Sequence, residues 1–238
     1  MWDKPDRILC WCGPRARPQN GAVSAEDLAA RFSRRLEERG ASCSSREVEQ
    51  LAIYVGLLTK WNNKVNLTAL QLNPISDDAI DRLIVEPVMG ASLLRAGTEV
   101  VKGHLVDVGS GGGSPAIPLK VALPDLRLTM VESKERKSAF LREAVRSLGL
   151  LETTVLTQRV EDLAADPIGR GSVQVVSVRA VRLDEALWSA LDALLAVDGV
   201  VLWFRAAADA VKAADQFKVE SVLATRDSRD EIALLRRR

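Results

Sequence analysis

Cysteine, histidine and tyrosine are scarce in this chain, and each shortage excludes a class of protein. The three cysteines, Cys10, Cys12 and Cys43, are odd in number and lie near the start, so the sequence has neither a disulfide framework nor a Cys-x-x-Cys zinc pair. The single histidine, His104, leaves no Ser-His-Asp set and no metal-ligand cluster, and gives no support for a hydrolase or a metalloenzyme. We therefore expect no bound metal, a reducing cytoplasmic location and a structural role for His104.

Long apolar runs and an excess of charge are also missing. No apolar run approaches the length of a membrane span, and residues 1–21 lack the apolar core of a signal peptide, so we expect no membrane contact. Lysine and arginine total 33 against 32 acidic residues, so any basic surface must come from local clustering. A chain of 238 residues, 47% of them hydrophobic, can form one domain with a core, or one domain plus a small helical cap.

The N-terminal part has helical patterns that follow an irregular start. Residues 1–23 show no period, which predicts a disordered extension, and residues 24–98 predict a helical cap that forms one unit with the rest. Ser24 with Asp27, and Ser44 with Glu47, have the spacing of capping boxes. The helix after Ser44 has an apolar stripe, Val48, Leu51, Ile53, Tyr54, Leu57, Leu58 and Trp61, and ends at Asn62-Asn63. A third helix is expected over residues 76–94.

Residues 99–238 change to short β-branched or apolar runs separated by helical stretches, which predicts an α/β domain with a mostly parallel sheet. Expected strands span 104–108, 127–131, 153–157, 173–177 and 198–204, and expected helices span 115–122, 134–148 and 184–195. Two final runs, 217–225 and 230–236, flank the polar turn Asp227-Ser228-Arg229 and predict an antiparallel hairpin that closes the sheet.

A glycine-rich loop follows the first expected strand. Asp107 ends the strand, and Gly109 and Gly111 begin a cluster of glycines that lets the backbone touch a ligand directly. Glu132 follows the second strand, 23 positions after Gly109, where an acid can bind ribose hydroxyls. A tight turn from strand to helix, with Glu132 as a helix cap, is the alternative for the same residues.

Two classes of cofactor share this layout. A nicotinamide enzyme would need Gly-x-Gly-x-x-Gly, but Ser114 occupies the sixth position and Pro115 follows it. A reductase would also need a Tyr-x-x-x-Lys pair, and Leu58 stands four residues after Tyr54. The pattern Asp-x-Gly-x-Gly-x-Gly after a hydrophobic strand is closer to a loop that binds S-adenosyl-L-methionine.

Several separate blocks resemble one family, the 16S ribosomal RNA guanine-N7 methyltransferases, also called glucose-inhibited division protein B. The blocks span residues 58–69, 107–119, 132–141, 159–161 and 179–180, in the family's order. The most specific is Trp61-Asn-Asn-Lys-Val-Asn-Leu-Thr68, because other methyltransferases share the glycine loop but not this helix end. The resemblance implies a Rossmann-like methyltransferase fold, S-adenosyl-L-methionine as the donor and a guanine of 16S rRNA, or of the small ribosomal subunit, as the acceptor.

The resemblance also implies roles for individual residues. The family binds the donor at the positions of Gly109 and Ser114, at the adenine-side pair Val160 and Glu161, and at Arg179. With the acid and glycines of the loop, the expected donor-binding residues are Asp107, Gly109, Gly111, Ser114, Glu132, Val160, Glu161 and Arg179.

The residues expected to contact the acceptor RNA depart from the family pattern. Where many members have Arg-His-x-x-Asp/Glu-Ser, this chain has Arg82, Leu83, Glu86 and Pro87, and Arg205 replaces a common lysine after the fifth strand. Guanine N7 carries a lone pair and no proton, so the transfer requires positioning and no general base. We expect three residues to orient the RNA and to form the catalytic set: Arg82, Arg179 and Arg205.

Other basic side chains are candidates for contact with RNA. They lie along one expected helix: Lys134, Arg136, Lys137, Arg142 and Arg146. A solvated helix face is the alternative for Arg142 and Arg146, and residues 236–238 are expected to form a frayed tail. Trp61 is expected in the core.

The sequence leaves three functional hypotheses. The first is an active, monomeric rRNA guanine-N7 methyltransferase. The second is a ribosome-binding or RNA-binding module with weakened catalysis on the same fold, suggested by Leu83, Pro87 and Arg205. The third is a methyltransferase for another acceptor.

Overall fold

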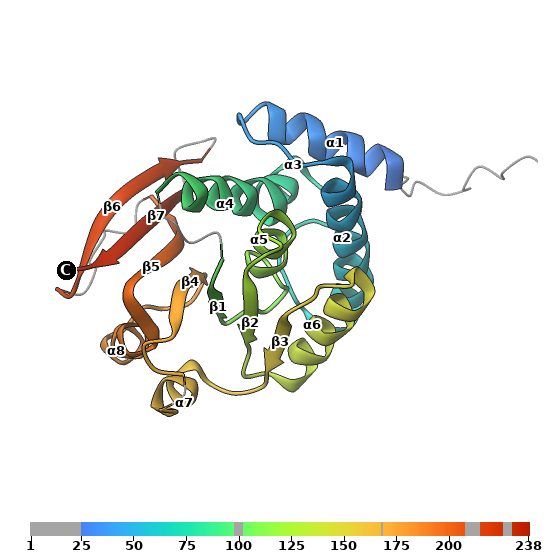
Figure 1. The fold of residues 1–238 in the computed structure, drawn as a ribbon. Coiled ribbons are helices and arrows are strands. Elements are labelled where there is room, and N and C mark those ends of the chain that lie inside the picture. The colour runs from blue at the N-terminus through green and yellow to red at the C-terminus, as the bar shows by residue number, and fades with distance from the viewer. Residues whose placement is uncertain (1–24, 98–101, 168, 208–214, 226–229) are drawn as a thin grey trace, which may run out of the picture.

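A seven-stranded sheet forms the centre of the computed structural model, which describes residues 25–97, 102–167, 169–207, 215–225 and 230–238 (Figure 1). The strands run in the order β3-β2-β1-β4-β5-β7-β6. They are β1 (His104–Val108), β2 (Arg127–Val131), β3 (Thr153–Leu156), β4 (Val173–Arg179), β5 (Leu195–Ala206), β6 (Phe217–Ala224) and β7 (Asp230–Arg237). Strands β1 to β5 pair in parallel, whereas β7 is antiparallel to both β5 and β6. The predicted sheet and its closing hairpin are confirmed.

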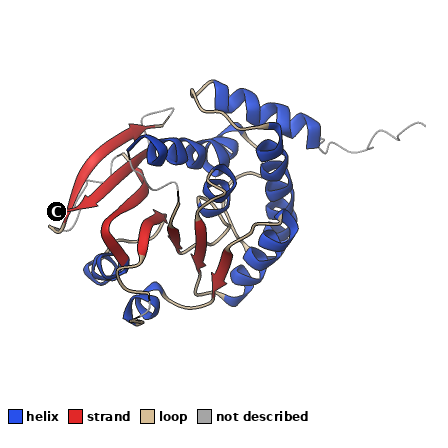
Figure 2. Cartoon of the chain, in the orientation of Figure 1, coloured by secondary structure: helices blue, strands red, loops and turns tan. Residues whose placement is uncertain are grey.

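Helices surround this sheet (Figure 2). They are α1 (Ala25–Glu37), α2 (Ser45–Val65), α3 (Asp77–Ile80), the π-helix η1 (Asp81–Val85), α4 (Glu86–Gly97), α5 (Ala116–Ala122), α6 (Glu135–Leu148), α7 (Val160–Ala165) and α8 (Glu185–Leu194). The capping box of Ser44 and Glu47 at the start of α2 is present. The predicted extension 1–23, the cap at Ser24 and the turn 227–229 lie outside the described residues.

The alternation of side chains along each strand divides the core into two layers. In β1, Leu105 packs into a cluster with helices α1 to α6, whereas Val106 and Val108 pack into a second cluster with α7 and α8. Parallel strands are buried on both faces, so each face of the sheet packs against an apolar cluster. The cap helices therefore share one core with the sheet.

The strand order reverses between β1 and β4, which pair side by side. In open α/β sheets a ligand binds at the carboxyl ends of the strands at such a switch point. Gly109 follows β1, Glu132 follows β2, and Arg179 ends β4. The topology thus gathers the predicted residues at one edge of the sheet.

The structure corrects four details of the sequence analysis. The single helix expected over 76–94 is divided into α3, η1 and α4, and α7 was not predicted. Ile53 was placed in the apolar stripe, but it is 49% exposed because it faces away from the core. Arg236 and Arg237 were expected to fray, yet they belong to β7, where Arg236 pairs with Glu220 and Arg237 with Asp192.

His104 lies at the amino end of β1, on the opposite edge of the sheet from Gly109. Its Nε2 atom lies 2.8 Å from the Thr129 hydroxyl, and burial lowers the pKa of His104 to about 4. Within the described residues, no helix is both long enough and apolar enough to cross a bilayer.

Candidate functional site

A cavity of about 250 Å³ lies at the carboxyl ends of β1 and β2. Gly109, Glu132, Val160 and Glu161 line it, so the structure brings together four of the predicted donor-binding residues. We call this space the donor cavity. Its wall also includes Val181, which follows β4.

The glycine loop that borders the donor cavity has a backbone that other residues adopt with difficulty. Gly109 has φ +68°, and a Cβ atom there would lie 2.8 Å from Cγ2 of Val181. Gly113 has φ +86°, and its Cβ would lie 2.6 Å from Ile117. The loop therefore needs glycine for its conformation and for the space beside it.

Glu132 is nearly buried and shapes the loop through both carboxylate oxygens. Oε2 accepts a hydrogen bond from the Gly111 amide at 2.9 Å, and Oε1 accepts one from the Lys134 amide at 2.8 Å. Each carboxylate oxygen has a second lone pair for a ligand hydroxyl. Glu132 can thus hold the loop and also bind a ribose at the edge of the donor cavity.

Asp107, Gly111, Ser114 and Arg179 do not line the donor cavity, although the sequence placed them with the donor. The buried Asp107 side chain accepts a hydrogen bond of 2.6 Å from the hydroxyl of Ser177, its neighbour on β4. Burial raises the pKa of Asp107 to about 6. The Asp107 side chain thus links the end of β1 to β4, while its direct contact with the donor stays a prediction.

Helix α2 and the segment after it support the glycine loop from the other side. Tyr54, which is fully buried, donates a hydrogen bond of 2.6 Å to the Gly112 carbonyl. Asn62 accepts hydrogen bonds from the Leu67 and Thr68 amides and donates one to the Thr68 carbonyl. These contacts explain the most specific sequence block, because it builds the wall against which Gly112 packs. The same helix end includes Trp61, which was expected in the core but is only partly buried: it packs against the core at Phe140, with ring centroids 5.9 Å apart.

A second cavity, of about 240 Å³, adjoins the donor cavity and contains the three predicted arginines. Arg82, Arg179 and Arg205 all line it, and so does Val181. We call it the acceptor cavity. Val181 therefore lines both cavities, and the structure places the predicted RNA-orienting residues next to the predicted donor site.

Arg179 is the most constrained of the three arginines. It donates to Glu86 at 2.6 Å, to the Ser114 hydroxyl at 3.2 Å and to the Arg82 carbonyl. Its guanidinium lies 4.4 Å from the centroid of the Phe204 ring. Burial lowers the pKa of Arg179, and the charge of Glu86 opposes that shift. Ser114 therefore acts here as a support for Arg179, a role that the sequence did not indicate.

Arg205 and Arg82 also face carboxylates. Arg205 is buried and donates to Glu231, its cross-strand neighbour in β7, at 2.7 Å. Its guanidinium lies 5.3 Å from the Trp203 ring. Arg82 is more exposed, and its Nε lies 3.7 Å from Asp230. Arg82 is thus the arginine that can most readily leave its partner for a phosphate.

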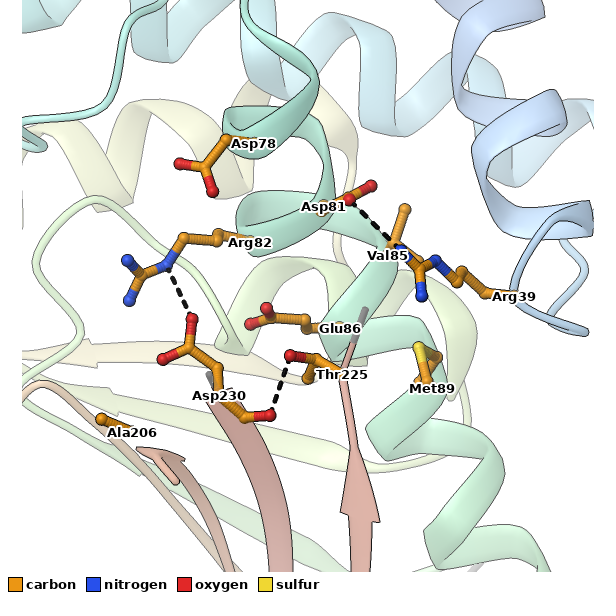
Figure 3. A pocket seen from close by; sticks show the side chains of 10 residues that line it. All are labelled: Arg39, Asp78, Asp81, Arg82, Val85, Glu86, Met89, Ala206, Thr225 and Asp230. Carbon is orange, nitrogen blue, oxygen red and sulfur yellow. Dashed lines mark hydrogen bonds and ion pairs between the residues drawn. The ribbon is translucent and has the colours of Figure 1, made fainter. Parts of the chain in front are cut away.

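A third cavity, of about 290 Å³, continues from the acceptor cavity and shares Arg82, Glu86, Ala206 and Asp230 with it (Figure 3). Asp78 and Asp81 add two further carboxylates. Within the described part of the chain, no group of three or more histidine, cysteine or acidic side chains is arranged to hold a metal ion.

The basic face of α6 is only partly available for contacts. Arg142 pairs with Glu135 at 3.0 Å, and Arg146 pairs with Glu143 at 2.6 Å. Lys134 and Arg136 are exposed at the start of this helix, close to Glu132. These two are the better candidates for RNA phosphates.

The sequence of this chain matches a known family. Residues 47–230 match the family described as rRNA small subunit methyltransferase G, or GidB. This chain belongs to that family. The match covers the α2 end, the glycine loop and all three arginines of the acceptor cavity, and it confirms the predicted family and the predicted class of enzyme.

Individual members of the rRNA small subunit methyltransferase G family agree with this assignment. The chain is 34% identical over 186 residues to a member from Streptococcus pyogenes serotype M12, with 78% of this chain and 74% of the relative covered. A member from Paracoccus denitrificans is 44% identical over 119 residues, which cover 50% of this chain and 58% of the relative.

Solved structures support the fold. A point mutant of MtNAS in complex with S-adenosylmethionine has a TM-score of 0.53 at 12% identity, covering 90% of this chain and 96% of that one. The Escherichia coli protein yhhF, described as a methyltransferase, has a TM-score of 0.50 at 14% identity, covering 61% of this chain and 82% of that one. The predicted Rossmann-like methyltransferase fold is confirmed.

Proposed function

We propose that this chain transfers a methyl group from S-adenosyl-L-methionine to N7 of a guanine in 16S rRNA. The observation that carries the proposal is the shared wall at Val181, which lines both the donor cavity and the acceptor cavity in a member of the rRNA small subunit methyltransferase G family. Direct transfer between two bound molecules requires such adjacent sites.

The residues of the donor cavity suit the proposed donor. Gly109 leaves room for close approach where a Cβ would fill the space, and Val160 offers an apolar surface to an adenine ring. The carboxylates of Glu132 and Glu161 can accept hydrogen bonds from hydroxyl and amino groups. When bound, S-adenosyl-L-methionine supplies an electrophilic methyl group on a sulfonium.

The acceptor side needs orientation more than proton transfer. Guanine N7 has a free lone pair, so the residues need only align the nitrogen with the methyl carbon and the sulfur. Positioning of this kind lowers a barrier by about 7–11 kcal/mol. Arg179 is held rigidly by its partners and shapes the acceptor cavity, while Arg82 can turn to an RNA phosphate.

The acceptor is presented by 16S rRNA or by the small ribosomal subunit. In this proposal the chain acts as a monomer in the cytoplasm and uses no metal.

The proposal is tested in a bacterial strain that lacks its own enzyme of this family. The strain is complemented with this chain, and its small-subunit rRNA is cleaved chemically at 7-methylguanosine and mapped by primer extension. One new cleavage site in 16S rRNA is the expected result. Donor binding by the purified chain without any new site would instead favour a ribosome-binding module, and a methyl group at another atom would indicate a different acceptor.

A further inference from the structure

The proposed acceptor atom cannot by itself distinguish the two purines. Guanine and adenine both carry an unprotonated N7, so an enzyme that aligns only N7 would accept either base. The bases differ at position 6, which is next to N7, and on the Watson–Crick edge farther from N7. Guanine has N–H donors at N1 and N2, whereas adenine has an acceptor at N1 and an amino group at N6.

Glu86 lies where it can meet that side of the base. It is the first residue of α4 and lines the acceptor cavity, whose Val181 wall borders the donor cavity. A base with N7 toward Val181 would direct its far edge toward Glu86 and the third cavity. Figure 3 shows the Glu86 carboxylate pointing into this space, between Arg82 and Asp230.

The Glu86 side chain is mostly buried, and only one of its two carboxylate oxygens accepts a hydrogen bond from the described residues. The residue is 6% exposed, and its Oε2 accepts a hydrogen bond from Arg179 at 2.6 Å. Among the described residues, no hydrogen bond reaches its Oε1. Oε1 is not one of the buried atoms that lack a partner, so it is open to the cavity and can accept a hydrogen bond from a ligand there.

We propose that Glu86 determines the specificity for guanine by accepting hydrogen bonds from N1–H and the N2 amino group of the target base. This inference rests on the proposed function and adds the selection of the base. Arg179 fixes the carboxylate, and Arg179 is in turn fixed by Ser114 and by the Phe204 ring. The recognition element is therefore rigid before the RNA arrives.

An ionised carboxylate only accepts hydrogen bonds, so it discriminates by chemistry as well as by shape. It matches two adjacent donors of guanine and opposes the N1 lone pair of adenine. Inosine retains N1–H and N7 but lacks the N2 amino group. A lost hydrogen bond to a fixed carboxylate lowers kcat/KM by roughly tenfold to a hundredfold.

The test uses small-subunit rRNA with guanine, inosine or adenine at the methylated position and the purified full-length chain. We expect kcat/KM to fall roughly tenfold or more from guanine to inosine, and further for adenine. In Glu86→Gln the ratio of guanine to inosine should fall toward one. The matched control is Asp230→Asn, which changes another carboxylate of the same cavity and should keep the parent ratio.

The outcomes separate the two proposals. If the parent methylates guanine and inosine equally, the role of Glu86 is refuted while the proposed function stands, and this comparison decides the matter even where Glu86→Gln does not fold. If Glu86→Gln folds and keeps the parent ratio, the role of Glu86 is also refuted. If the parent transfers no methyl group to the guanine RNA, the proposed function fails and the inference fails with it.

Discussion

The Tyr54 hydroxyl donates a hydrogen bond of 2.6 Å to the carbonyl oxygen of Gly112 and so joins α2 to the glycine loop. Tyr54→Phe should remove this link and leave the part-buried carbonyl of Gly112 without its partner. We expect the free energy of unfolding to fall by about 1–3 kcal/mol and the affinity for S-adenosyl-L-methionine to fall as the loop loosens. Urea denaturation and titration calorimetry measure the two effects.

Thr59 offers the control for Tyr54. Its hydroxyl also bonds to a backbone carbonyl, that of Val55, but within α2 itself. Thr59→Ala should leave donor affinity at the parent value. Equal donor affinity in Tyr54→Phe and Thr59→Ala would show that α2 does not hold the loop.

Gly109 has a positive φ and also lacks room for a Cβ atom. A second glycine allows the two effects to be measured separately. Gly149 has φ +61° at the end of α6, but a Cβ there would meet nothing within 4 Å. Both Gly109→Ala and Gly149→Ala should lower the free energy of unfolding by about 1 kcal/mol through the left-handed backbone. Only Gly109→Ala should weaken donor binding, by roughly tenfold or more, because its Cβ displaces Val181. An unchanged donor affinity in Gly109→Ala would contradict the location of the donor cavity.

Glu132 holds the loop amides, and its proposed contact with the ribose can be tested apart from that role. The measurement compares the binding of S-adenosylhomocysteine with that of its 2′,3′-dideoxy analogue in the parent and in Glu132→Gln. The parent should prefer the natural ribose by roughly tenfold or more, and Glu132→Gln should lose most of this preference. If Glu132→Gln weakens the binding of both ligands by the same factor, Glu132 only holds the loop and does not contact the ribose.

Titration of Asp107 should make the free energy of unfolding depend on pH, in a direction that follows from its raised pKa. Burial raises the pKa of Asp107 to about 6, while an aspartate in the unfolded chain titrates near 3.9. The folded state therefore binds the proton more tightly between these values. The stability from this group is fully present below the unfolded pKa and is lost as the pH rises through about 6.

Asp107→Asn isolates this effect, because its amide oxygen can still accept from Ser177. As the pH rises from about 4 to 7, the parent should lose stability relative to Asp107→Asn, by an amount on the order of 2 kcal/mol. Chemical denaturation across this pH range measures the difference. A difference that does not vary with pH would show that Asp107 titrates normally.

The sequence predicted those parts of the site that depend on local pattern. The strands were recognisable as short β-branched or apolar runs between helical stretches, and Gly109 and Glu132 were recognisable from their place after two of these strands. Pairs that form only in the folded chain were not predictable. Arg179 and Glu86 are separated by 93 positions, and Tyr54 and Gly112 by 58. The short helix α7 was missed because six residues are too few for a clear helical period.

We propose that this chain uses its two adjacent cavities to transfer a methyl group to guanine N7 of 16S rRNA. The most direct measurement incubates the purified chain with S-adenosyl-L-methionine and small-subunit rRNA or subunits from a strain that lacks the modification. Nucleoside mass spectrometry then identifies the product. We expect about one 7-methylguanosine for each 16S rRNA, and less in Gly109→Ala. Donor binding without 7-methylguanosine in either substrate, or a methyl group on another nucleoside, would contradict it.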